Sequence, residues 1–74
     1  MEQLAKNLFV LRKKQGLSRE AVARELRISS KTYERYEKNE RDPAAPLLVQ
    51  LADFFGVTLD QLVGRAPLPD ETQD

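Results

Sequence analysis

The chain contains no cysteine and no histidine in its 74 residues. Without cysteine it forms no disulfide bond, and without either residue type it lacks the usual ligands of a zinc site. The same absences remove the commonest nucleophile and the commonest general base of enzymes. No pair of a nucleophile and a base stands out among the remaining residues. We therefore expect neither an enzyme nor a protein that carries a metal or cofactor.

Long apolar runs and strand patterns are also missing. Charged residues make up 32% of the sequence and interrupt every apolar stretch. We find no signal peptide and no transmembrane segment, so a cytoplasmic helical protein with no membrane partner is expected. A chain of this length forms one domain and buries only about 60% of the surface of its unfolded state.

The balance of charge is zero overall but uneven along the chain. Residues 1–41 hold eleven Lys and Arg against six Glu, a balance of +5, and residues 42–74 hold one Arg against six Asp and Glu, a balance of −5. This asymmetry indicates one basic and one acidic surface, and the local field matters more than the total near a phosphate backbone. The alternative is an ordinary mixture of solvated surface charges.

Helical periodicity and capping residues predict five helices and no strands, an all-α fold. Gly16, Gly56 and Gly64 are typical helix stops, and Thr58 with Gln61 matches a capping box. The predicted helices cover residues 1–15, 18–26, 29–38, 46–55 and 58–63. We expect the domain to span residues 1–64 and residues 65–74, which contain two prolines and several acidic residues, to form a disordered acidic tail.

The third predicted helix separates its residues by face. Successive side chains rotate by about 100°, which puts Tyr33 and Tyr36 on one side. The opposite side carries three cations and one carboxylate: Lys31, Glu34, Arg35 and Lys38. Since a major groove is wide enough to admit a helix, we predict that the tyrosines pack inward and the charged side faces double-stranded DNA.

At this point the sequence resembles the Cro/XRE branch of the lambda-repressor-like DNA-binding domains. The resemblance runs from about Leu8 to Gly64. It is carried by L-R-K-x-x-G-L-S-x-E-x-x-A-x-x-L-x-I-S-x-x-T-Y-x-x-Y-E, which begins at Leu11, and by L-A-D-F-F-G-V-T-L-D, which begins at Leu51. It implies a compact five-helix domain whose second and third helices form a helix-turn-helix, with the third helix in the major groove.

The same resemblance implies a set of DNA-contacting residues and one structural ion pair. The contacts carried over to this sequence are Arg19, Ser29, Ser30, Lys31, Glu34, Arg35 and Lys38, followed by the phosphate-contacting loop from Asn39 to Arg41. The implied ion pair joins Arg12 and Glu37, and the alternative is two solvated charges of little net effect. Ser29 is also a candidate helix cap rather than a base contact.

Three positions depart from the family pattern. Arg19 stands where the family usually has Gln, and it can hold a phosphate with two donors. Arg27 stands where the turn usually has Gly, which costs roughly 1–2 kcal/mol if its backbone is left-handed. Asn39 replaces the usual Gly after the third helix, a change that a left-handed position tolerates.

These observations favour a sequence-specific DNA-binding transcriptional regulator. Since one helix reads only a few base pairs, we expect a homodimeric repressor that binds a palindromic operator. The candidates for its dimer surface are Phe54, Leu62 and Val63, whose alternative role is to complete the monomer core. The second hypothesis is a protein-interaction module, such as an antitoxin or an adaptor that binds a partner protein, which the overall neutrality and the acidic second half support.

Overall fold

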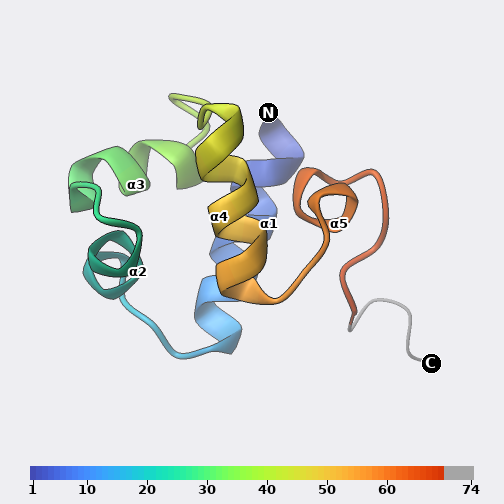
Figure 1. Ribbon diagram of the computed structural model, residues 1–74, viewed down its shortest axis with the longest axis horizontal. Coiled ribbons are helices and arrows are strands. Elements are labelled where there is room, and N and C mark those ends of the chain that lie inside the picture. The colour runs from blue at the N-terminus through green and yellow to red at the C-terminus, as the bar shows by residue number, and fades with distance from the viewer. Residues whose placement is uncertain (70–74) are drawn as a thin grey trace.

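The computed structural model describes residues 1–69, and these residues form five α-helices and no strand (Figure 1). The helices are α1 (Glu2–Lys14), α2 (Arg19–Leu26), α3 (Ser30–Glu37), α4 (Ala45–Phe55) and α5 (Leu59–Val63). The predicted all-α fold is therefore confirmed, with helix ends that differ from the predicted ones by at most one residue.

Three of the helices begin at side chains that cap their free backbone amides. Ser18 Oγ accepts a hydrogen bond from the amide of Ala21 at 3.0 Å and so caps α2. Ser29 does the same for α3 through the amide of Thr32, also at 3.0 Å. The predicted capping box at α5 is present, with Thr58 as the cap. Each cap stabilises its helix by about 1 kcal/mol, which matters for helices this short.

Left-handed residues end several helices, and two of these positions are informative. Gly64, after α5, has φ 90°, and a Cβ placed there would lie 2.3 Å from Cγ of Gln3, so only glycine fits. Arg27, after α2, has φ 59° although it carries a side chain. The strain anticipated for the replaced turn glycine is therefore present at Arg27.

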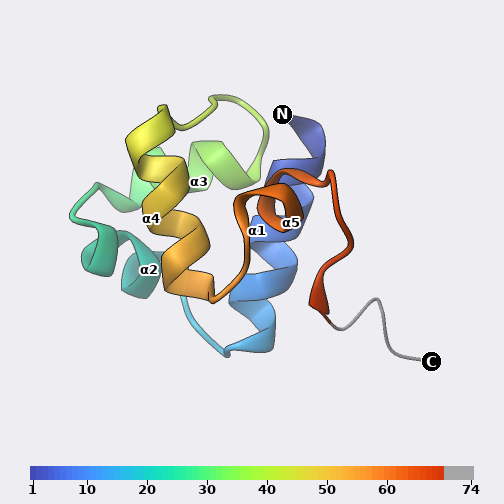
Figure 2. The same cartoon turned by 45° about the vertical axis from the view of Figure 1, so that its right-hand side comes forward.

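The helices surround one small core. In Figure 1, α1 and α4 occupy the middle of the molecule, while α2 and α3 lie to one side and α5 to the other. The turned view in Figure 2 shows α5 beside α1, which it contacts. The largest side chains that are fully buried are Tyr33, Leu4, Leu8, Leu51, Leu62 and Val22. They come from all five helices, so the position of α3 depends on packing against the whole domain rather than on α2 alone.

The packed chain continues beyond α5. Leu68 is only 3% exposed and belongs to the same core cluster as the helix residues. Residues 65–69 are thus held against the domain, in contrast to the disordered tail expected from residue 65 onward. Residues 70–74, the rest of that predicted tail, lie outside the described part of the chain.

Among residues 1–69, none of the five helices has both the length and the apolar character needed to cross a bilayer.

Candidate nucleic-acid interface

The outer face of α3 is charged and its inner face is aromatic. Tyr33 is 0% exposed and Tyr36 is 5% exposed, so both rings anchor the helix in the core. The residues that face solvent at the start and along the outside of α3 are Ser29, Ser30, Lys31, Arg35 and Lys38. This is the separation of faces that the periodicity of the sequence predicts.

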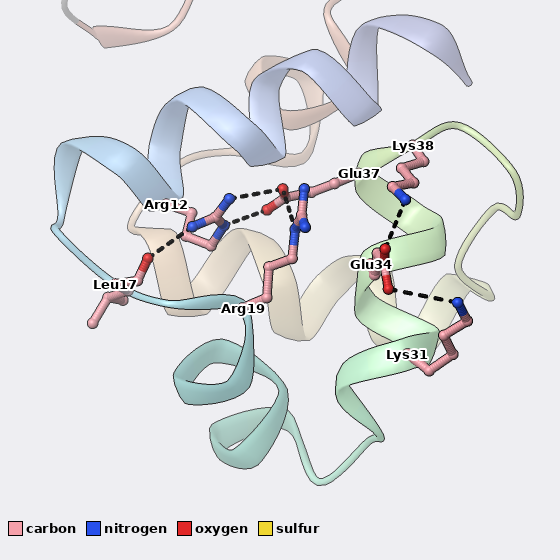
Figure 3. A network of polar contacts seen from close by, with 7 residues as sticks. All are labelled: Arg12, Leu17, Arg19, Lys31, Glu34, Glu37 and Lys38. Atoms are coloured by element: carbon pink, nitrogen blue, oxygen red, sulfur yellow. Dashed lines mark hydrogen bonds and ion pairs between the residues drawn. The ribbon is translucent and has the colours of Figure 1, made fainter.

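An ion-pair chain runs along the outer face of α3 (Figure 3). Glu34 lies between two lysines, with its carboxylate 3.8 Å from Nζ of Lys31 and 2.7 Å from Nζ of Lys38. The hydrogen bond from Lys38 and the charge of Lys31 lower the pKa of Glu34. In return, the hydrogen bond to Glu34 raises the pKa of Lys38. Glu34 and Lys38 are consequently both charged near neutral pH, and Glu34 offsets part of the positive field of this face.

Two arginines at this face have no ion-pair partner among residues 1–69. Arg35 lies on the exposed side of α3, and Arg41 is exposed in the loop that follows. Asn39, at the start of that loop, is left-handed with φ 58°, and its Oδ1 accepts a hydrogen bond from the amino group of Met1 at 3.2 Å. The loop from Asn39 to Arg41 therefore extends the polar surface of α3 beyond its C-terminal end.

The Arg12–Glu37 pair that the resemblance implied is present and buried. Arg12 donates to the Glu37 carboxylate from Nε at 2.6 Å and from Nη2 at 3.0 Å. Its third nitrogen, Nη1, donates to the carbonyl oxygen of Leu17 at 2.9 Å. The side chains of Arg12 and Glu37 are 9% and 1% exposed, respectively. Arg12 thus ties together α1, the turn before α2 and the last residue of α3.

Glu37 also binds Arg19, a contact that the sequence did not predict. Nε of Arg19 donates to Oε1 of Glu37 at 3.2 Å, and the Arg19 side chain is 36% exposed. Figure 3 shows both guanidinium groups converging on this one carboxylate. Burial alone would raise the pKa of Glu37, but the hydrogen bonds from its partners outweigh burial and hold the pKa below its usual value.

Tyr33 lies beside this buried cluster. Its hydroxyl oxygen is the one buried side-chain polar atom in the described residues that lacks a hydrogen-bond partner. Burial and the neighbouring Glu37 carboxylate raise the pKa of Tyr33, so the phenol stays neutral. Because a neutral hydroxyl adds no charge, Arg12 and Arg19 are the groups that compensate the charge of Glu37.

The predicted dimer candidates occupy different environments. Leu62 is 0% exposed and completes the monomer core, which is the alternative role that the sequence left open for it. Phe54 and Val63 are half-buried. Leu59, which the sequence did not single out, is 44% exposed and lies one helical turn before Val63 on α5.

The sequence is similar to those of known proteins. A profile of the helix-turn-helix family matches residues 9–62. The chain is 44% identical over 58 residues to the HTH-type transcriptional regulator AnsR of Bacillus subtilis, covering 78% of this chain and 50% of that protein. It is 32% identical over 62 residues to the HTH-type transcriptional regulator ImmR of the same organism, covering 84% of this chain and 49% of that protein.

A solved structure supports the same grouping. The crystal structure of a transcriptional regulator from Listeria innocua superimposes with a TM-score of 0.82 at 33% identity, covering 89% of this chain and 62% of that one. The chain spans about half the length of the two curated relatives it matches.

Proposed function

The chain belongs to the helix-turn-helix family, and we propose that it is a transcriptional regulator that binds double-stranded DNA at specific sequences. The observation that carries this proposal is the separation of the two faces of α3. Tyr33 and Tyr36 are buried and anchor the helix in the core, and the exposed charged side chains lie on the opposite face. An α-helix with this arrangement fits the major groove, where side chains reach base edges and phosphates.

Individual residues in the proposal take roles that follow from their chemistry. Arg35 and Lys31 donate to guanine or to phosphate, and Glu34 accepts from N4 of cytosine. The remaining residues at the groove and its edges, which position α3 through polar and phosphate contacts, are Arg19, Ser29, Ser30, Lys38, Asn39 and Arg41. The Ser29 side chain already caps α3. Its part in DNA binding is therefore limited to contacts with the neighbouring DNA backbone and does not extend to a base.

The proposal includes a homodimer that acts as a repressor on a palindromic operator in the cytoplasm. Two recognition helices related by a twofold axis lie about 34 Å apart, one turn of the duplex. The apolar residues left accessible on α5 support a dimer surface there, since Leu59 is exposed and Val63 is half-buried. Phe54 at the end of α4, also half-buried, extends the candidate surface.

Binding to duplex DNA at increasing salt tests this function. We expect the protein to bind labelled duplexes at low salt and to lose affinity steeply as salt rises, because neutralised phosphates release counterions. A protein that binds no duplex at low salt would contradict the proposal. That result would favour the alternative of an interaction module, such as an antitoxin or an adaptor, which a search for a bound partner protein would then address.

A further inference from the structure

We propose that Glu37 is a positioning residue for DNA recognition, which holds Arg19 at the edge of the charged face of α3 in addition to anchoring Arg12. This inference rests on the proposed DNA-binding function. The juxtaposition that carries it is one buried carboxylate that accepts hydrogen bonds from two guanidinium groups, one buried and one at the surface.

The two arginines use their donors differently. Arg12 directs all three of its nitrogens to protein acceptors, Glu37 and the Leu17 carbonyl, and its side chain is 9% exposed. Arg19 gives only Nε to Glu37, and its two Nη groups have no hydrogen bond to any of residues 1–69. Since the Arg19 side chain is 36% exposed, those Nη groups are the donors that remain available to a ligand.

The charge of the cluster favours an anion. Two guanidinium cations share one carboxylate, so the cluster of Arg12, Arg19 and Glu37 carries a net charge of +1 from these three groups. Arg12 is enclosed, and the excess charge is therefore presented by Arg19. Arg19 also lies close enough to the outer face of α3 to act electrostatically on Glu34 and Lys38. A phosphate at Arg19 would consequently flank the bases that α3 reads.

Only arginine meets both demands at position 19. A guanidinium can donate to Glu37 from Nε and still present two parallel donors to a phosphate. Lysine would keep the charge but has no second nitrogen to divide between the two acceptors. Glutamine, the usual residue of the family at this position, would lose the charge. Glu37 also restricts the rotamers of Arg19 before DNA arrives, and such preorganisation lowers the entropic cost of binding.

A double-mutant cycle on DNA binding tests the inference. The dissociation constant for one tightly bound duplex is measured for the wild-type chain, E37Q, R19Q and the double variant, at a temperature where circular dichroism shows all four to be folded. We expect E37Q to weaken binding by about tenfold in the wild-type background and by less than about twofold in the R19Q background. Any effect of E37Q through Arg12 is common to both backgrounds and cancels.

A matched control uses the exposed Arg24 of α2, which has no contact with Glu37. The cycle of E37Q with R24Q should show no coupling, so that E37Q costs the same with and without Arg24. If E37Q weakens DNA binding by the same factor in the wild-type and R19Q backgrounds, the inference is overturned and the proposed function is left intact. A wild-type chain that binds no duplex would overturn the proposed function and this inference with it.

A second variant keeps the inference testable if E37Q does not fold. R19K retains the charge, so its affinity should fall about as far as that of R19Q while the slope of log K against log salt stays at the wild-type value. The R19Q slope should become shallower by about one unit. Wild-type affinity in R19K would show that charge alone suffices and would overturn the positioning role of Glu37.

Discussion

Nε of Arg12 and Oε2 of Glu37 lie 2.6 Å apart, and Nη2 of the same arginine lies 3.0 Å from Oε1. This two-point pair connects the C-terminal part of α1 to the last residue of α3. Buried charges are costly when separated, because water no longer compensates them. The pair therefore helps to fix the orientation of α3, together with the burial of Tyr33 and Tyr36 in the core.

The first prediction concerns that pair. Glu37→Ala leaves Arg12 buried without its counter-ion and should lower the free energy of unfolding by about 3–5 kcal/mol. Urea denaturation followed by circular dichroism measures the change. Glu40→Ala, in the exposed loop after α3, is the control and should change stability by less than about 0.5 kcal/mol. Overlapping denaturation curves for Glu37→Ala and wild type would rule out a structural role for the pair.

Acid should destabilise the wild-type chain through the same carboxylate. Glu37 has a lower pKa in the folded state than its ordinary value of 4.5. Its contribution to stability is therefore fully present above pH 4.5 and is lost as the pH falls through the lower folded value, where Glu37 takes up a proton. Glu37→Gln should flatten the dependence of the unfolding free energy on pH below pH 4.5. Parallel pH profiles for the two chains would contradict this assignment.

Strain at the helix-turn-helix turn gives a third prediction. Arg27 is exposed and left-handed with φ 59°, a conformation that glycine adopts without steric cost. Arg27→Gly should raise the free energy of unfolding by about 0.5–1 kcal/mol, the relief of strain less the added entropy of the unfolded chain. Differential scanning calorimetry would detect the rise in melting temperature. A lower melting temperature would mean that the Arg27 side chain contributes more than its backbone costs.

Arg35 should matter for binding and not for folding. Its side chain is exposed on α3 and forms no ion pair within the described residues, so Arg35→Ala should leave the melting temperature unchanged. If Arg35 donates to a guanine, the variant should lose about 1–3 kcal/mol of specific binding, measured by fluorescence anisotropy on a tightly bound duplex. Arg65→Ala removes the same charge and serves as the control, because Arg65 follows α5, a helix on the opposite side of α1 and α4 from α3 (Figure 1). Equal affinities of Arg35→Ala and wild type would remove Arg35 from the interface.

The sequence predicts the helices and the faces of α3 well, because both follow from local rules. Tyr33 and Tyr36 are placed by a period of 3.6 residues, and Ser18 and Ser29 by capping preferences. The Arg12–Glu37 pair came from the family resemblance and not from periodicity, since nothing local relates two residues on different helices.

Features that depend on tertiary packing could not be predicted in the same way. The Arg19–Glu37 contact forms only because the start of α2 meets the end of α3. Leu62 could not be separated from Val63, since a helix of five residues is too short to define a buried side. Leu68 lies between prolines in a segment of disorder-like composition, yet it is buried in the core, and the amides of Arg65 and Ala66 donate to the carbonyl oxygen of Asp60.

The most direct test of the account is the selection of binding sites from a pool of random duplexes by the purified protein. If the exposed face of α3 reads the major groove in a dimer, the enriched sequences should converge on a palindrome whose half-sites lie about one helical turn, 34 Å, apart. A pool that remains random after repeated rounds would contradict DNA recognition by α3. Convergence on a single asymmetric half-site would keep the recognition helix and exclude the dimer.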